Sequence, residues 1–345
     1  MPLTEPGEDA MSTARSENAT SAPEPAAFRA LFNRTRLASL VVWIAFACYV
    51  VPLAIAEPQF ISFYNIISIL MLISVYALIG FGEGVVVLSG GIDLSVGSVV
   101  GLAGVVAALI LQGNAGLGWA LVAILGGVAA GIVIGTLNGI AVALLNIPAF
   151  VATLGTLSIA LGCGYVLSNG QQISINNMAF LDISVYSWFG IPIPVYIMFA
   201  VFFLLWLTLS RTRLGRYVYA VGGNIQAAFV AGLPIRRVLI SAFVISGALS
   251  GLAGVLLASQ ITAGIATTGT GYELIAIAAP VIGGISLAGG RGSIAGALFG
   301  VILLGTIDNG LTILNVSPFY QHIISGFIII LAVFLDTVAS RRKLV

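Results

Sequence analysis

No charged side chain occurs between positions 94 and 181, and this feature restricts the fold more than any other. Water-soluble domains contain about 25% charged residues, whereas Asp, Glu, Lys and Arg make up 7% of these 345 residues and the mean hydropathy is +1.14. Since one membrane-spanning helix needs about 20 apolar residues, the charge-free stretch must hold several helices. These values exclude a water-soluble enzyme and predict an all-α, polytopic membrane protein.

Short clusters of turn-forming residues divide the apolar sequence. They stand at positions 112–114, 146–148 and 169–172, where Gly, Asn, Gln or Pro follow one another. Such residues favour turns because Gly and Asn adopt left-handed backbone angles and Pro interrupts helices. Over the whole chain, helices of about 20 residues separated by such breaks predict about ten transmembrane helices, at positions 37–56, 63–88, 95–112, 118–145, 149–168, 192–210, 238–262, 272–289, 293–313 and 319–338.

The basic residues predict the orientation of these helices. If the N-terminus is cytoplasmic, all 13 Lys and Arg residues fall on the cytoplasmic side, in the N-terminal tail, the 211–237 loop, Arg291 and the C-terminal end. Cytoplasmic loops carry an excess of Lys and Arg, so we expect both termini in the cytoplasm. An odd number of crossings before or after the 211–237 loop would destroy this distribution.

The chain has three expected regions. Residues 1–36 combine four prolines with nine charged side chains, a composition typical of disorder, and form a predicted cytoplasmic tail. Residues 37–338 are the predicted transmembrane domain, with a cytoplasmic loop at 211–237. Residues 339–345 form a basic cytoplasmic C-terminus.

Glycine patterns predict repeated and closely packed structure. The sequence Gly-Gly-Ile-Asp-Leu-Ser at 90–95 recurs as Gly-Gly-Ile-Ser-Leu-Ala at 283–288, which suggests two related halves, a common feature of transporters. A chance match within a glycine-rich sequence is the alternative. The spacing of Gly247 with Gly251, and of Gly300 with Gly305, favours close helix packing in lipid.

The chain lacks the residues for nucleotide or metal chemistry. Its one lysine, Lys343, stands at the C-terminal end, so there is no Walker A loop, which requires a lysine for phosphate binding. ATP and Mg²⁺ would therefore be bound by a partner subunit, and no cofactor is expected in this chain. Cys48 and Cys163 lie in apolar runs and are predicted to be buried free thiols. Nucleic-acid binding is not expected, because the sequence has no basic patch beyond short clusters that flank the membrane.

The 211–237 loop contains a candidate docking element. Asn224 is placed to cap a short helix whose small face is formed by alanines, and Gly232 followed by Pro234 would end it. A small cytoplasmic helix flanked by arginines suits the groove of another protein. A loop whose charges only set the membrane orientation explains the same residues equally well.

Polar residues within the predicted helices are candidates for the substrate path. Charged groups in membrane helices are costly and mark function by default. Asp93 could cap the following helix or accept hydrogen bonds from the hydroxyl groups of a substrate, and Glu273 could anchor a helix N-terminus or serve transport. Glu83, between two glycines, requires a wet cavity or a partner. The remaining candidates are Asn138, Thr153, Thr156, Asn309, Gln321 and His322, for which helix packing or structural hydrogen bonding is the alternative.

Several longer motifs carry a resemblance to a known family. They stand at 88–97 (LSGGIDLSVG), 148–156 (PAFVATLGT), 212–217 (TRLGRY), 222–224 (GGN), 269–274 (GTGYEL) and 283–292 (GGISLAGGRG). The segments 308–311 and Tyr320–Gln321 also fit, and the likeness as a whole extends in order over residues 37–343. The sequence resembles the permease family of bacterial monosaccharide ABC importers, which includes ribose, xylose, arabinose and galactose permeases, with a ribose-type sugar as the foremost expectation.

This resemblance implies a function and a set of partners. A permease of this family forms the translocation path in the inner membrane and is not itself an enzyme. It implies an ATP-binding cassette subunit in the cytoplasm, a periplasmic sugar-binding protein and a second permease protomer, expected to be identical. It also places Gly222, Gly223, Asn224, Ala228 and Gly232 on the coupling helix that faces the ATPase.

Two other transporter classes remain as alternatives. A branched-chain amino-acid ABC permease would share the architecture, although the motifs at 90–95 and 269–273 favour a sugar. An ion-coupled secondary transporter would use mid-span carboxylates, for which Glu83 and Asp308 are candidates. A membrane-embedded enzyme is disfavoured, because no nucleophile and base can be placed on neighbouring helices.

Overall fold

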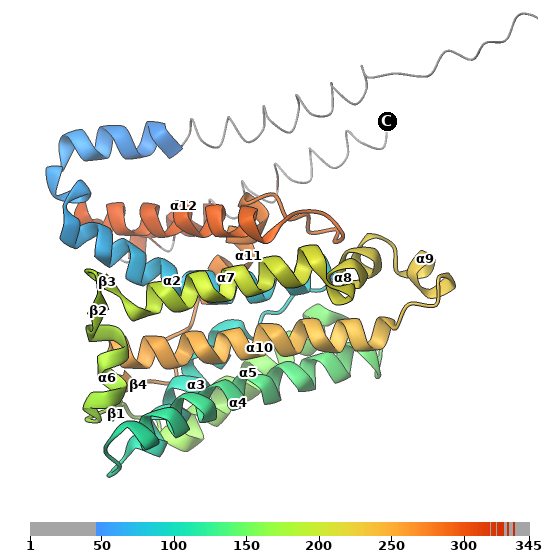
Figure 1. Cartoon of the computed structure of the whole chain (residues 1–345), viewed down its shortest axis with the longest axis horizontal. Helices are drawn as coiled ribbons and strands as arrows, with labels where there is room; N and C mark the ends of the chain where they lie inside the picture. The colour runs from blue at the N-terminus through green and yellow to red at the C-terminus, as the bar shows by residue number, and fades with distance from the viewer. Residues whose placement is uncertain (1–45, 318, 322, 328–329, 331–333, 335–345) are drawn as a thin grey trace, which may run out of the picture. The chain divides into compact units, whose positions relative to one another are not determined.

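The computed structural model describes residues 46–317, 319–321, 323–327, 330 and 334, and divides into one unit up to Ile55 and another from Ala56 onwards. In the first unit the described residues, 46–55, are helical. The second unit is mostly helical (Figure 1). Its elements are η1 (Pro58–Ile61), α2 (Phe63–Leu88), α3 (Val96–Leu111), α4 (Leu117–Ala143), α5 (Ala149–Ser168), β1 (Ile173–Ser174), α6 (Met178–Val185), β2 (Ser187–Trp188), β3 (Ile191–Pro192), α7 (Ile193–Arg211), α8 (Arg213–Gly223), α9 (Ile225–Val230), α10 (Ile235–Gln260), β4 (Ala263–Gly264), α11 (Tyr272–Ile282) and α12 (Ile294–Ile313).

Six of the described helices, α2, α4, α5, α7, α10 and α12, are long and apolar enough to cross a membrane. The prediction of a helical membrane protein is confirmed. The number ten is not reached among the described residues, because α3 and α11 have 16 and 11 residues and are shorter than the about 20 required. The tail at 1–36, residues 37–45 of the first predicted helix, half of the last one and the C-terminus at 339–345 lie outside the described residues.

The predicted boundaries agree closely with the structure except at α11. α5 spans 149–168 as predicted, and α4, α7, α10 and α12 begin and end within a few residues of the expected positions. The helix expected at 272–289 stops at Ile282. After this residue Gly284 adopts φ +89, and the Ile285 N–H donates to the Pro280 carbonyl at 2.9 Å. These two features end the helix.

Helix α10 packs against α2, α3 and α4, and glycines allow the closest of these contacts. A Cβ atom on Gly247 would overlap the carbonyl oxygen of Gly131 on α4, and one on Gly251 would lie 2.7 Å from the Gly127 carbonyl oxygen. Small residues let membrane helices approach so that their backbones touch. The close packing predicted for Gly247 and Gly251 is confirmed.

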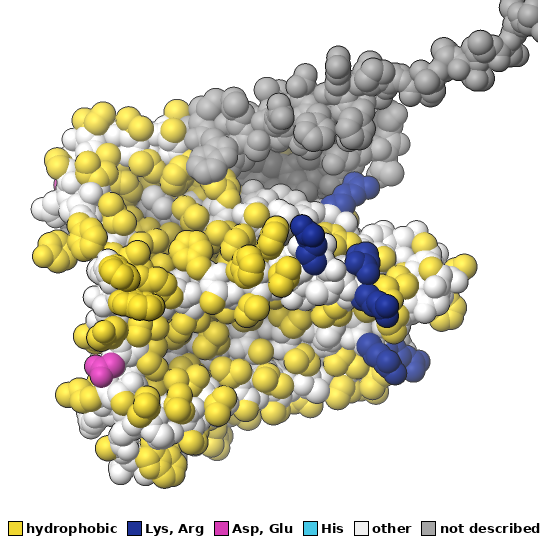
Figure 2. All heavy atoms as spheres, in the orientation of Figure 1, with side chains coloured by type: hydrophobic (Ala, Val, Ile, Leu, Met, Phe, Trp, Pro, Cys, Tyr) yellow, Lys and Arg dark blue, Asp and Glu magenta, His cyan; other side chains and the backbone are white. Residues whose placement is uncertain are grey.

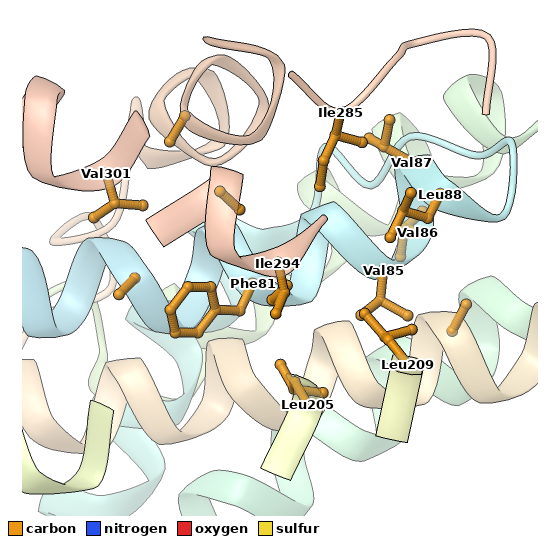
Figure 3. Packing of buried hydrophobic residues seen from close by; sticks show 14 of the residues in the cluster. Phe81, Val85, Val86, Val87, Leu88, Leu205, Leu209, Ile285, Ile294 and Val301 are labelled. Atoms are coloured by element: carbon orange, nitrogen blue, oxygen red, sulfur yellow. The ribbon is translucent and has the colours of Figure 1, made fainter. Parts of the chain in front are cut away.

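The largest apolar core surrounds α2 (Figure 3). In this view Val85 of α2 lies next to Leu209 of α7, and Phe81 of α2 lies next to Ile294 of α12, the helix that also carries Val301. All five side chains are buried. The core therefore holds together α2, α7 and α12, which are far apart in the sequence.

The described arginines gather at one end of the second unit, which we call the arginine end (Figure 2). Here α7 ends, α8 and α10 begin, and the loops at 89–95, 144–148 and 283–293 come together. Counting the predicted helices from a cytoplasmic N-terminus places the loops at 89–94, 146–148 and 290–292 on the same side of the membrane as 211–237. Their grouping is confirmed.

The opposite end carries short elements that the sequence did not predict. β1 pairs with β4 in antiparallel register, with Ile173 opposite Gly264, and β2 pairs with β3 in a hairpin. In the chain, α6 lies between β1 and β2.

The prediction of two buried thiols is wrong, because Cys48 and Cys163 are both exposed, although both are free. Apolar flanking residues indicate a lipid-compatible segment but do not say which side of the helix faces outward.

Candidate functional site

The six-residue helix α9 projects from the arginine end (Figure 1). The side chain of Asn224 caps it by accepting the Ala227 N–H at 2.9 Å. At its other end Gly232 adopts φ +71, and the Leu233 N–H donates to the Ala228 carbonyl at 3.0 Å. The short helix predicted from Asn224 and Gly232 is confirmed.

The exposed side of α9 is formed by large apolar residues. Phe229 and Val230 are 75% and 86% exposed, whereas Ala228 is 4% exposed and packs inward. An exposed apolar patch on a capped helix is typical of a protein interaction site. Sequence reasoning emphasised the alanines and missed Phe229 and Val230, although two large apolar residues in an otherwise small and polar loop are a visible signal.

Gly222 and Gly223 lie at a junction inside the arginine end. A Cβ atom on Gly222 would overlap the Leu88 carbonyl oxygen, which already accepts the Gly290 N–H at 3.0 Å. On Gly289 a Cβ atom would lie 3.1 Å from the Cα atom of Gly90. The turn at Gly90 and the Gly289–Gly290 turn therefore meet at the end of α8. This arrangement links α8 directly to the breaks that follow α2 and α11.

A second contact fixes α8 against the same region. The Tyr219 hydroxyl donates to the Gly292 carbonyl at 3.0 Å. Burial raises the pKa of the Tyr219 hydroxyl, so the group stays a protonated donor. Movement of α8 would therefore be passed to the 283–293 loop.

A groove of about 660 Å³ lies beside α9. Its walls come from the loops at 89–91 and 146–149, from Ile225 and Phe229 of α9, and from the start of α10. Arg236 and Arg237 border it. The arginine end thus presents an apolar helix next to an open groove with positive charge.

Asp93 is the centre of a buried polar network between α2 and α3. Its Oδ1 accepts the Ser95 N–H at 3.0 Å and the Ser95 hydroxyl at 2.6 Å, and its Oδ2 accepts the Ser246 hydroxyl of α10 at 2.9 Å. Asp93 is 1% exposed. Its bonds to Ser95, the residue before α3, form an Asx turn beside the helix and not a cap on its first N–H groups, and they give the carboxylate structural partners in place of sugar hydroxyls.

The network continues through the other predicted path residues. Asn138 of α4 donates to the Ser95 hydroxyl at 2.9 Å and accepts the hydroxyl of Thr156 on α5. Thr153 donates to the Ile92 carbonyl at 3.2 Å. The structure therefore brings together Asp93, Asn138, Thr153 and Thr156. All four are buried. Through their bonds to Ser95 and Ser246, they connect α3, α4, α5 and α10 in this conformation.

Glu83 lies in the same network. It is buried, and both of its carboxyl oxygens face the Asp93 N–H, at 3.1 and 3.2 Å. The glycines on either side of it permit close packing, since a Cβ atom on Gly82 would lie 2.9 Å from the Ser246 Cα atom. The partner that the sequence requires for Glu83 is thus the backbone of the α2–α3 break.

The remaining predicted path residues lie elsewhere. Glu273, in the first turn of α11, accepts the Gly271 N–H at 3.1 Å. Asn309 forms a reciprocal amide pair with Asn65, with bonds of 2.9 and 3.0 Å. Gln321 donates to the Val316 carbonyl at 2.9 Å. His322 lies outside the described residues.

Comparison with known proteins assigns the chain to a transporter family. The model of the family described as branched-chain amino acid transport system / permease component matches residues 65–333. This range covers most of the chain, from α2 to beyond α12. The chain belongs to this permease family.

Curated relatives of this permease include three sugar transport proteins. It is 39% identical to the L-arabinose transport system permease protein of Escherichia coli (strain K12), over 87% of this chain and 90% of the relative. It is 41% identical to the ribose import permease protein of Bacillus subtilis (strain 168), over 83% and 89%. The D-allose transport system permease protein of Escherichia coli (strain K12) is 38% identical, over 84% and 88%. No solved structure matches.

Proposed function

We propose that this permease forms the membrane pathway of an ABC importer for a monosaccharide of the ribose type. The relatives named for ribose, L-arabinose and D-allose match over more than four fifths of both chains. The family description refers to branched-chain amino acids, but the similarity to these sugar permeases favours a sugar. The chain is a multi-pass protein of the inner membrane, and ATP hydrolysis with Mg²⁺ belongs to a partner subunit.

The topology follows from the basic residues. We place the arginine end in the cytoplasm, because Lys and Arg are enriched in cytoplasmic loops. With the helices at 37–56 and 319–338, this gives about ten membrane segments of varied length and cytoplasmic termini. Both short helices, α3 and α11, then lie beside longer helices that cross the membrane fully.

The partners occupy opposite ends of the permease. An ATP-binding cassette subunit docks at the arginine end, and a periplasmic sugar-binding protein delivers the sugar at the opposite end. A second copy of this chain completes the pathway as a homodimer. Alternating access follows when ATP binding moves α9 and α8, and the junction at Gly222 passes this movement to the α2–α3 and α11–α12 breaks.

The observation that carries the docking proposal is the exposed apolar surface of α9. Phe229 and Val230 are 75% and 86% exposed on a helix capped at both ends. Gly222, Gly223 and Ala228 act behind this surface as packing residues, whereas Asn224 and Gly232 set the limits of the helix. The ATPase contact is therefore centred on Phe229 and Val230.

Copurification from detergent tests this function. We expect an ATP-binding cassette subunit to copurify with the tagged wild-type permease and to be lost in the Phe229→Asp, Val230→Asp double variant. Phe189→Asp is the matched control, because Phe189 is equally prominent, at 89% exposed, but lies in the β2–β3 hairpin. If no such subunit binds the wild type, and the purified protein moves solute along an ion gradient in liposomes, the secondary-transporter alternative holds.

A further inference from the structure

A second cavity, away from the arginine end, has the chemistry of a sugar site. It has a volume of about 250 Å³ and lies between α2, α11 and α12. At about 30 Å³ per water, this space holds about eight water molecules. Its polar and aromatic lining consists of Tyr76, Thr270, Tyr272, Asp308, Gln321 and Ser325.

The two tyrosines and the carboxylate form one connected arrangement. The Tyr76 hydroxyl donates to Asp308 Oδ2 at 3.2 Å. The rings of Tyr76 and Tyr272 meet edge to face, with centroids 5.3 Å apart. This geometry fixes the angle between the two rings. It also places the Tyr76 hydroxyl and the Asp308 carboxylate next to aromatic surface.

The depth of the cavity suits a translocation pathway. Tyr76 lies near the middle of the 26-residue helix α2, about 20 Å from its first residue at about 1.5 Å per residue. Tyr272 is the first residue of the short helix α11. Transporter substrate sites typically lie near the membrane midplane, where helices are interrupted.

We propose that this cavity is a monosaccharide-binding site on the import path. A sugar has apolar C–H faces that pack against aromatic rings and hydroxyl groups that bond to carboxylate, amide and hydroxyl groups. The cavity offers both kinds of surface. The cavity is larger than a single metal ion requires. A branched aliphatic side chain is disfavoured, because it would bury the Asp308 carboxylate against apolar surface.

This inference rests on the proposed function and moves the sugar contacts away from the buried Asp93 network. Among the predicted path residues that the structure describes, Gln321 alone lines this cavity. Tyr76, Tyr272 and Asp308 would be the main contacts. The Asp93 network instead holds the surrounding helices in position.

Sugar uptake by variants of the cavity tests the proposal. We expect Asp308→Ala and Tyr272→Ala to reduce uptake of radiolabelled sugar by the assembled importer at least tenfold. Tyr165→Ala, on exposed α5, is expected to transport like the wild type. Copurification of the ATPase subunit should be unchanged in all three, which separates failure of this site from failure of the proposed function.

A filling variant guards against loss of folding as the explanation. Ser325→Trp leaves the tyrosines and Asp308 intact but occupies the cavity, whereas Ser158→Trp adds the same ring on an exposed face of α5. We expect only Ser325→Trp to block uptake, with both variants eluting as monodisperse protein. Normal uptake by Ser325→Trp and Asp308→Ala would overturn the proposal. Uptake that needs an ion gradient and is lost in Asp308→Asn would make the cavity an ion site instead.

Discussion

Two serines one turn apart on α10 differ in a single hydrogen bond. Ser246 and Ser250 are both fully buried. The Ser246 hydroxyl donates to Asp93, whereas no described residue forms a hydrogen bond with the Ser250 hydroxyl. Removing a donor from a buried carboxyl group leaves an unsatisfied acceptor, while removing an unpaired hydroxyl removes a desolvation cost.

We therefore predict that Ser246→Ala lowers the free energy of unfolding by about 1–3 kcal/mol, and that Ser250→Ala leaves it unchanged or raises it. Thermal unfolding of the purified variants in one detergent measures the difference. Equal midpoints for the two variants would show that the Ser246 bond contributes nothing. Since the two substitutions remove the same atom from the same helix, the comparison isolates the bond to Asp93.

At the level of single residues, sequence reasoning found the right polar groups but not their partners. It selected Asp93, Asn138, Thr153 and Thr156, which the structure joins in one network. It did not foresee that these side chains bond to each other. The reason is physical: they come from the α2–α3 break and from two helices, α4 and α5, and only helix packing decides which polar groups meet.

At the level of helices, the contact between α4 and α10 depends on glycines. A Cβ atom on Gly247 would overlap the Gly131 carbonyl oxygen, whereas a Cβ atom on Gly155 of α5 would have no neighbour within 4 Å. We predict that Gly247→Ala destabilises the protein by about 1–3 kcal/mol, because overpacking forces the helices apart. Gly155→Ala should be neutral or stabilising by up to about 1 kcal/mol. Thermal unfolding midpoints check both values, and a stable Gly247→Ala protein would contradict the close contact.

Helix positions were largely predictable from the sequence, and the short elements were not. Apolar length and turn residues located α5 and α12 to within a residue, because hydrophobic length is the dominant requirement in a membrane. The same rule overextended α11, whose apolar sequence continues past the glycines that end it. The two-stranded sheets were missed, since strands of two residues have no periodicity. α8 was missed because its 11 residues include two arginines and lack the apolar length that located the spanning helices.

For the molecule as a whole, the distribution of arginines predicted which loops would meet. The loops at 89–94, 146–148, 211–237 and 290–292 were assigned to one side by counting the predicted helices from a cytoplasmic N-terminus, an orientation chosen from the basic residues, and the structure brings them to one end. The cavity between α2, α11 and α12 could not be predicted in this way. It requires Tyr76 and Asp308, which lie 232 positions apart, to approach each other.

The orientation of that end gives the last prediction. Gln226 on α9 and Gln171 after α5 are both exposed and lie at opposite ends. In a background with Cys48 and Cys163 replaced by Ala, a membrane-impermeant maleimide should modify the Gln226→Cys variant only in inside-out vesicles. It should modify the Gln171→Cys variant only in right-side-out vesicles, because the arginine end faces the cytoplasm. Labelling of both from the same side would mean that α7 does not cross the membrane. The reversed pattern would place α9 outside the cell, where no ATPase subunit could reach Phe229 and Val230.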